Sequence, residues 1–255
     1  MKLRELDDKI EGKLKLYLIG GGNMSLLGLK DATKDIDVVL DGEKELYLLK
    51  KGLLECGYRE VFSPIYRGMG SRLLMGNEDG FRWDVFVGTI CHGLVLSPYM
   101  RQRSMEYHLN LENLRLLLLS KEDVFLFKGV TERDRDLEDM HILFLQGLDF
   151  KVIVDEIRWQ SKHSKVAWTA YLLQRLRNLQ EEYGVVIPGV EEIEELAEED
   201  VATILILDKL SNRDYTIEEL LQEFHEDREY IKMLIRKLED RGEIERRGDT
   251  LIRRK

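Results

Sequence analysis

Cysteine, proline and long apolar runs are scarce in this chain. Its 255 residues include two cysteines and three prolines. Two cysteines exclude a disulfide framework, and neither has a second cysteine at the spacing of a zinc or redox motif. No run approaches the roughly 20 apolar residues that cross a bilayer, and residues 1–9 are charged, with no apolar signal segment after them. We therefore expect a cytoplasmic protein with no membrane partner.

Positive charge is also in short supply. The chain has 49 acidic against 39 basic residues, a formal net charge of -10. This balance argues against a protein that coats nucleic acid through bulk positive charge. Hydrophobic residues make up 44% of the chain, enough for one large core or two modest ones. The composition predicts a globular protein in which nucleic-acid contact would need a local basic surface.

Strand signals dominate the first 150 residues. Residues 14–19 form an apolar run that stops at three glycines, the pattern of a buried strand entering a tight turn, and a helix capped by Asn23 should follow. Further strands are expected over residues 35–40, 72–75, 81–87, 105–111 and 114–119. Helices are expected over residues 43–56, from Ser120 to Lys128, and from about Thr131. This alternation predicts an α/β (α+β) domain with a mixed sheet.

Helical periodicity replaces the strand signals after about residue 150. It runs over residues 152–183 and through an acidic helix at 191–199. Three helices, over 201–210, 216–224 and 227–241, and a short hairpin should follow, which is the order of a winged helix-turn-helix. The pattern predicts an α/β domain over residues 1–149, a helical region over 150–199 and a winged helix over 200–255.

Three aspartates are the strongest candidates for chemistry. Asp35 and Asp37 lie two apart on an expected strand, so both side chains point to one face, and Asp84 lies on a neighbouring strand. Adjacent carboxylates repel, and Mg²⁺ is typically held by one or two carboxylates plus phosphate oxygens. Together with a glycine turn that opens a helix, these acids predict a site for a metal-bound polyphosphate.

Two short motifs carry a resemblance to a known family. The sequence Ile-Gly-Gly-Gly-Asn at 19–23 is followed by Thr-Lys-Asp-Ile-Asp-Val at 33–38. This pairing resembles the DNA polymerase β-like nucleotidyltransferase superfamily. With Lys128 and the Arg-Asp-x-x-Asp sequence at 135–139, it is more closely similar to the AbiEii-type toxins and related minimal nucleotidyltransferase-like proteins. The resemblance covers residues 14–145.

The resemblance implies a nucleotidyltransferase that moves a nucleoside monophosphate from a nucleoside triphosphate to a hydroxyl of RNA, protein or a small molecule. It implies that Asp35 and Asp37 hold two Mg²⁺ or Mn²⁺ ions, and that Asp84 binds the catalytic ion and acts as, or orients, the base. The residues that it implies for nucleotide binding are Gly21, Gly22, Lys128 and Arg135, and the candidate set also includes Asn23 and Ser25 at the start of the following helix. Two metal ions about 4 Å apart can stabilise the attacking oxygen and the leaving pyrophosphate.

Two positions depart from the family pattern and keep other functions open. Asn23 stands where relatives commonly have a small or hydroxylated residue, and Asp31 stands where they have an arginine. Ser25 could still offer a hydroxyl to phosphate. The alternatives are an inactive, nucleotide-sensing DNA-binding regulator and the toxin of a toxin–antitoxin pair.

Structural interpretations also remain open for single residues. Asp84 could be an ordinary salt-bridged strand acid, and Lys128 could simply complement a helix dipole. Arg135 and Asp139 share a helix face and could form an ion pair. The Cys91-His92 pair has no partner at a metal-binding spacing and is expected to be an ordinary loop. The aromatic residues expected to pack between helices are Trp159, Trp168 and Tyr171.

The C-terminal segment carries a local excess of basic residues. Residues 200–255 contain 14 acids and 12 bases, whereas residues 227–255 contain 10 bases and 7 acids. The cations that could contact nucleic-acid phosphates are Lys232, Arg236, Arg246 and Arg247. Winged helices also serve as protein-interaction modules, so the partner and the oligomeric state stay open.

Overall fold

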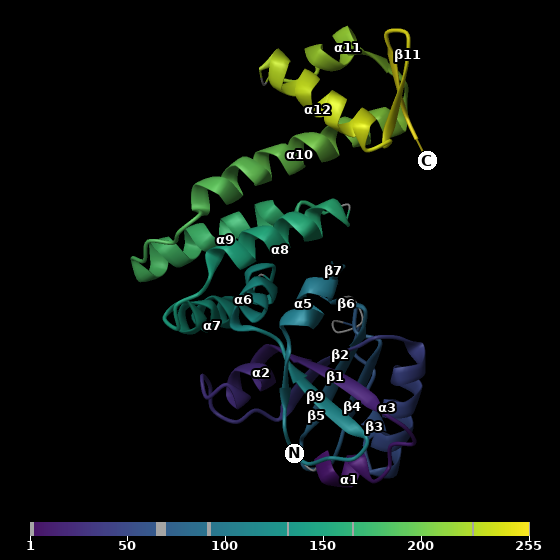
Figure 1. Ribbon diagram of the computed structural model, residues 1–255, viewed down its shortest axis with the longest axis vertical. Helices are drawn as coiled ribbons and strands as arrows, with labels where there is room; N and C mark the ends of the chain where they lie inside the picture. Colours follow the sequence, from purple (N-terminus) through teal and green to yellow (C-terminus); the bar gives the residue numbers. More distant parts are fainter. Residues whose placement is uncertain are drawn as a thin grey trace.

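The computed structural model describes residues 3–64, 70–90, 93–131, 133–164, 166–225 and 227–254. A mixed sheet occupies the N-terminal end of the molecule, helices form its middle, and a small module of helices and strands lies at the C-terminal end (Figure 1). Cys91 and His92, for which a loop is expected, lie outside the described residues.

Four central strands form the middle of the sheet: β1 (Leu14–Ile19), β2 (Asp35–Leu40), β5 (Arg82–Val87) and β9 (Leu114–Leu118). The flanking strands are β3 (Arg59–Glu60), β4 (Leu73–Gly76), β6 (Thr89–Ile90), β7 (Leu94–Val95) and β8 (Met105–Tyr107). The main order is β3-β4-β5-β2-β1-β9-β8. Because β1 pairs with β9 and β2 with β5 in parallel while the other pairs are antiparallel, the expected mixed α/β sheet is confirmed.

The alternation of side chains along the strands separates two cores. Leu16, Leu18 and Val38 face the side covered by α1 (Leu3–Asp7) and α3 (Glu43–Glu55). The opposite face carries Tyr17, Ile19, Val39 and Phe86, which pack in one cluster with the helices of the middle region. Because the strand period is two, Asp35, Asp37 and Asp84 belong to this second face, toward the helices.

The first helix after β1 starts earlier than expected. Helix α2 spans Gly20–Leu26, so it begins inside the glycine run, and its N-cap is Ile19. Asn23 therefore does not cap the helix. Its buried side-chain amide donates to the carbonyl oxygens of Leu18 and Leu119, at 2.8 and 3.3 Å. The expected cap does not form because the carbonyl oxygens of Leu18 and Leu119 need a hydrogen-bond donor inside the protein, and the buried Asn23 amide provides it.

Two helices close over the sheet. Helix α6 (Lys121–Gly129) begins where the sequence predicts, because the Ser120 side chain accepts from the Asp123 N–H. Helix α7 (Asp134–Phe144) begins later than the expected Thr131, after an extended residue Arg133. The short helix α5 (Pro98–Arg103), which the sequence patterns do not predict, lies between β7 and β8.

The middle region contains α8 (Phe150–Lys162), α9 (Trp168–Tyr183) and α10 (Val190–Asn212). The sequence predicts two helices where α10 stands, with a boundary at residues 199 and 200, and this prediction is wrong. The helix is continuous because no glycine or proline interrupts it. Its two halves bury opposite faces: Ile193 and Ala197 pack in the cluster of the middle region, and Ala202 and Ile206 pack in the cluster of the C-terminal module. It runs from the middle of the molecule into the C-terminal module (Figure 1).

The C-terminal module has its own buried cluster. It contains β10 (Tyr215–Thr216), α11 (Ile217–Gln222), α12 (Arg228–Asp240), β11 (Ile244–Arg247) and β12 (Thr250–Arg253). The three strands form an antiparallel sheet in the order β10-β12-β11. The capping box between Thr216 and Glu219 is confirmed. In the part of the chain that is described, no helix is long and apolar enough to span a lipid bilayer.

Candidate active site

Two of the three predicted aspartates stand side by side. The parallel register of β2 and β5 places Asp37 opposite Asp84 and Asp35 opposite Arg82. All four side chains line a cleft of about 170 Å³ at the end of β1, which α6 and the start of α7 also line. The strand pairing thus brings carboxylates that are 47 residues apart in sequence into one cavity.

Burial strongly perturbs both facing carboxyls. It raises the pKa of Asp84 to about 6, and the negative charge of Asp37 adds to this while a hydrogen bond from Ser71 opposes it. Burial likewise raises the pKa of Asp37 to about 6, opposed first by the positive charge of Lys128. Two carboxyls in one cavity therefore resist ionising together, which is the electrostatic condition that a bound cation relieves.

Glycine is required where β1 turns into α2. Gly20 has a φ of +63°, and a Cβ at this position would lie 2.5 Å from Asp37 Oδ2. A side chain would therefore collide with the carboxylate as well as strain the backbone. Gly21 lines the cleft, whereas Gly22 packs against Leu18 beneath it. The close approach of this turn explains the glycine run better than a turn signal alone.

Asp35 does not join the other two carboxylates. Its Oδ1 accepts from Arg82 Nε at 2.8 Å and lies 2.8 Å from the same guanidinium's terminal nitrogen. Within the described ranges, no three His, Cys, Asp or Glu side chains gather closely enough to hold a metal ion. The expected set of three carboxylates is therefore not assembled here, and the reason is an arginine directly across the strand that no sequence motif singles out.

A cluster of cations forms the opposite wall of the cleft. The ammonium of Lys128 lies 2.5 Å from Asp136 Oδ1 and 2.7 Å from Asp139 Oδ2. Both of these carboxylates are almost fully buried, and they also pair with Arg133 and Lys30, at 2.9 and 2.6 Å. Lys128 is thus paired with two buried acids, so its role is more specific than complementing the dipole of α6. No sequence pattern points to Lys30 and Arg133, because their role depends on tertiary contacts.

Arg135 lines the same cleft with an exposed side chain. The ion pair considered between Arg135 and Asp139 is not the one that forms, since the Asp139 oxygens lie next to Lys30 and Lys128. Asp139 faces the protein interior, whereas Arg135 stays at the mouth.

Besides Gly22, two predicted nucleotide-binding residues lie outside the cleft lining. Asn23 is fully buried against backbone carbonyls, as described above. The Ser25 hydroxyl donates to the carbonyl oxygens of Gly21 and Asp31, at 3.0 and 2.6 Å. Ser25 therefore ties α2 to the loop that follows it.

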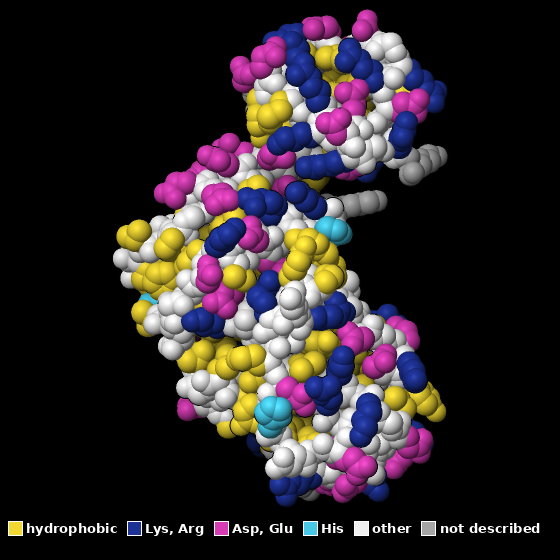
Figure 2. Space-filling model, viewed as in Figure 1, with side chains coloured by type: hydrophobic (Ala, Val, Ile, Leu, Met, Phe, Trp, Pro, Cys, Tyr) yellow, Lys and Arg dark blue, Asp and Glu magenta, His cyan; other side chains and the backbone are white. Residues whose placement is uncertain are grey.

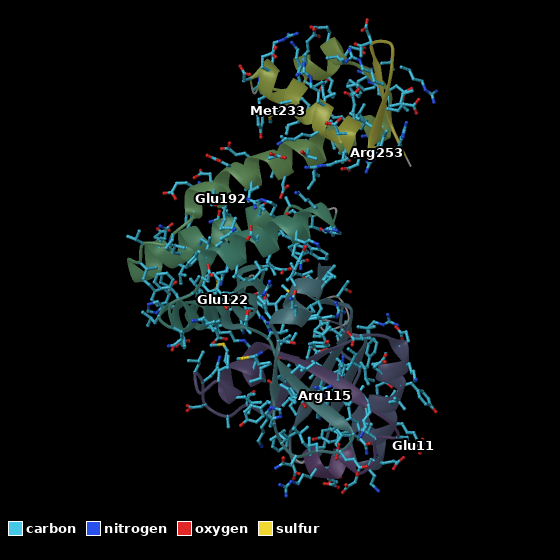
Figure 3. All side chains as sticks on the ribbon, in the orientation of Figure 1. Glu11, Arg115, Glu122, Glu192, Met233 and Arg253 are labelled. Atoms are coloured by element: carbon cyan, nitrogen blue, oxygen red, sulfur yellow. The ribbon has the colours of Figure 1, made fainter. Side chains whose placement is uncertain are left out.

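The expected nucleic-acid contacts of the C-terminal module are mostly engaged in ion pairs. Lys232 pairs with Glu229 at 2.7 Å and Arg247 with Glu245 at 2.9 Å, while Arg246 lies 4.0 Å from Asp249. Arg236 is exposed beside this cluster. Basic and acidic side chains alternate over the visible face of the module (Figure 2). Arg253, labelled in Figure 3, instead donates to Leu207 O and fastens β12 to α10.

The aromatic residues divide between core and surface. Trp168 is buried as expected, but Tyr171 is about half exposed. Trp159 stacks on His163 with ring centroids 3.9 Å apart.

Comparison with known proteins does not show a family. No family model and no curated protein matches the chain. Among solved structures, the chain is similar to an antigenic nucleotidyltransferase-like protein from Paracoccidioides brasiliensis, with 14% identity over 72% of this chain and 84% of that one and a TM-score of 0.38. A likeness at this level does not carry an assignment.

Proposed function

We propose that the protein is a metal-dependent nucleotidyltransferase that moves a nucleoside monophosphate from a nucleoside triphosphate to a hydroxyl acceptor. The observation that carries the proposal is the cleft itself, where Asp37 and Asp84 stand side by side and face a wall of cations. One wall suits a divalent ion and the other suits phosphate, which together describe a site for a metal-bound polyphosphate.

The donor set of the cleft fits Mg²⁺ or Mn²⁺. Asp37 and Asp84 provide two hard oxygen ligands. Burial raises the pKa of both carboxyls, so a bound cation would favour their ionised forms, and phosphate oxygens would complete the coordination. Asp35 would become a third ligand once its ion pair with Arg82 is broken. A second metal ion would bind together with it. When bound, the metal would neutralise charge on the transferring phosphoryl group.

The residues of the chain would divide the remaining work. Lys128 and Arg135 would hold phosphate oxygens, because both line the cleft across from the carboxylates. The turn at Gly21 leaves room for the triphosphate beside α2. Asp84 would accept the proton of the acceptor hydroxyl, or orient the group that does. Asn23 and Ser25 drop out of this scheme because their side chains bond to backbone within the fold.

The C-terminal module would serve recognition. We assign residues 200–255 to a winged helix, with α12 as the recognition helix and β11 and β12 as the wing, supported by the element order and the three-stranded sheet. Its cations are largely paired with acids, which weakens the case for phosphate contact. Nucleic acid is therefore one candidate partner and protein the other.

A labelling reaction tests the proposal. The protein is incubated with α-labelled ATP, GTP, CTP or UTP, with Mg²⁺ or Mn²⁺, and with total cellular RNA or protein. We expect label transfer by the wild type and by Asp79→Asn, an exposed control, but not by Asp37→Asn or Asp84→Asn. Absence of label with folded wild type, whichever metal is supplied, would contradict the proposal and favour the nucleotide-sensing, DNA-binding regulator.

A further inference from the structure

A serine hydroxyl already stands next to the carboxylate that the proposed reaction would use as its base. The Ser71 hydroxyl donates a hydrogen bond to Asp84 Oδ1. A general base must lie within hydrogen-bond reach of the hydroxyl whose proton it takes. In the proposed reaction, the hydroxyl beside Asp84 is that of the acceptor. Ser71 is not among the residues that line the cleft, but its hydroxyl contacts the carboxylate to which the proposed reaction gives the acceptor's proton.

The backbone around Ser71 explains how a residue outside the strand reaches Asp84. Gly70 has a φ of +89°, a conformation that favours glycine, and the chain bends at Arg72 before β4 begins. The N–H of Arg72 donates to Val85 O at 2.9 Å, and its guanidinium lies 2.7 Å from a carboxylate oxygen of Glu43. The first contact holds the bend against β5, and the second ties it to α3.

Exposure separates Ser71 from an ordinary core hydroxyl. Its side chain is partly exposed, whereas Asp84 beside it is buried and lines the cleft. Ser71 thus combines a proton acceptor within reach with an approach from the side of solvent.

We infer that Ser71 is a site of self-nucleotidylation, at which the protein attaches a nucleoside monophosphate to its own side chain. This inference rests on the proposed function. In the step, Ser71 Oγ attacks the α-phosphorus of a nucleoside triphosphate and its proton passes to the Asp84 carboxylate. The bond from the α-phosphorus to the bridging oxygen breaks, and pyrophosphate leaves with that oxygen. The products are a phosphodiester on Ser71 and pyrophosphate.

The modification would also block the site. A nucleotide attached to Ser71 removes the hydroxyl proton that now bonds Asp84 and places a phosphodiester charge beside two carboxylates. Transfer to other acceptors should then decline as the adduct accumulates, and the protein would limit its own activity when no acceptor is present.

The sequence offers a clean place to look for the adduct. Trypsin cuts after Arg67 and Arg72, and the peptide between them, Gly-Met-Gly-Ser-Arg, contains Ser71 as its single hydroxyl residue. The full-length protein is incubated with ATP and Mn²⁺, and then with each other nucleoside triphosphate. It is digested and the mass of this peptide is measured. We expect an increase by one nucleoside monophosphate in the wild type and in the Ser63→Ala control, and none in Ser71→Ala or Asp84→Asn.

The outcomes separate this inference from the function it rests on. Ser71→Thr keeps a hydroxyl and should keep the adduct on the same peptide at a lower rate. Transfer to added RNA or protein without an adduct on this peptide, or an adduct on another peptide alone, would overturn self-nucleotidylation at Ser71 and leave the transferase standing. Neither self-labelling nor transfer, in folded wild type, would overturn both.

Discussion

Replacing Asp84 by asparagine should stabilise the metal-free protein. The Asp84 side chain is 7% exposed, and its pKa rises from 3.8 to about 6 in the fold. Raising a pKa by one corresponds to about 1.4 kcal/mol, so ionising Asp84 at pH 7 costs the folded state up to about 3 kcal/mol. Asparagine has nearly the same shape, carries no charge and can still accept the hydrogen bond from Ser71. We expect the variant to gain about 2–3 kcal/mol in its free energy of unfolding.

The sign of the pH dependence follows from the direction in which the pKa moves. Because the folded-state pKa lies above the unfolded value, the native protein binds more protons than the unfolded chain between about pH 4 and pH 6. This contribution is favourable below that range and is lost as the pH rises through about 6. The advantage of Asp84→Asn should therefore be largest at pH 7 and shrink toward pH 4.5.

Scanning calorimetry in EDTA measures the effect. For a chain of this size, 2–3 kcal/mol corresponds to roughly 4–12 °C in melting temperature. Added Mg²⁺ should raise the melting temperature of the wild type and leave that of Asp84→Asn nearly unchanged, because ligands stabilise the state that binds them. The control Asp79→Asn, which is exposed, should stay within about 0.5 kcal/mol of wild type. A variant less stable than wild type at pH 7 in EDTA would refute the reasoning.

Three further substitutions or conditions probe the same cleft. Lys128→Met leaves Asp136 and Asp139 buried with fewer cations and should lower the free energy of unfolding by about 3 kcal/mol in urea titrations; an unchanged midpoint would show that the acids need no lysine. Gly20→Ala should abolish label transfer and Mn²⁺ binding, since its Cβ would meet the Asp37 carboxylate, and retained Mn²⁺ binding by electron paramagnetic resonance would contradict this. Wild-type affinity for Mn²⁺, followed by calorimetry, should weaken as the pH falls from 7 to 5, because protons compete for carboxyls with pKa values near 6; a pH-independent affinity would place the metal elsewhere.

Local patterns are sufficient to predict the central strands and the shared face of Asp35 and Asp37. The apolar run at 14–19 and the alternation at 35–40 each lie within one strand, so a period of two places Asp35 and Asp37 on one face. The caps at Ser120 and Thr216 are likewise local, because each side chain bonds an N–H three residues ahead.

The remaining site residues depend on contacts between distant segments. Arg82 faces Asp35 only through the parallel register of β2 and β5, and a single sequence does not reveal register. Ser71 reaches Asp84 through a bend and an antiparallel pairing of β4 with β5. The helix-cap prediction for Asn23 is wrong for a similar reason, since its partner Leu119 lies 96 residues away. Tertiary pairing, not local propensity, selects these residues.

Helix α10 gives the molecule a mechanical property. Its 23 residues form one rod about 35 Å long that belongs both to the middle region and to the C-terminal module. With a flexible linker in place of α10, a partner could bind the C-terminal module without moving the helices of the middle region. A rod instead converts any tilt of the C-terminal module into a displacement of helices α8 and α9, which pack on α10. It also sets the angular phase of the module: one residue inserted into α10 would turn everything beyond it by about 100°.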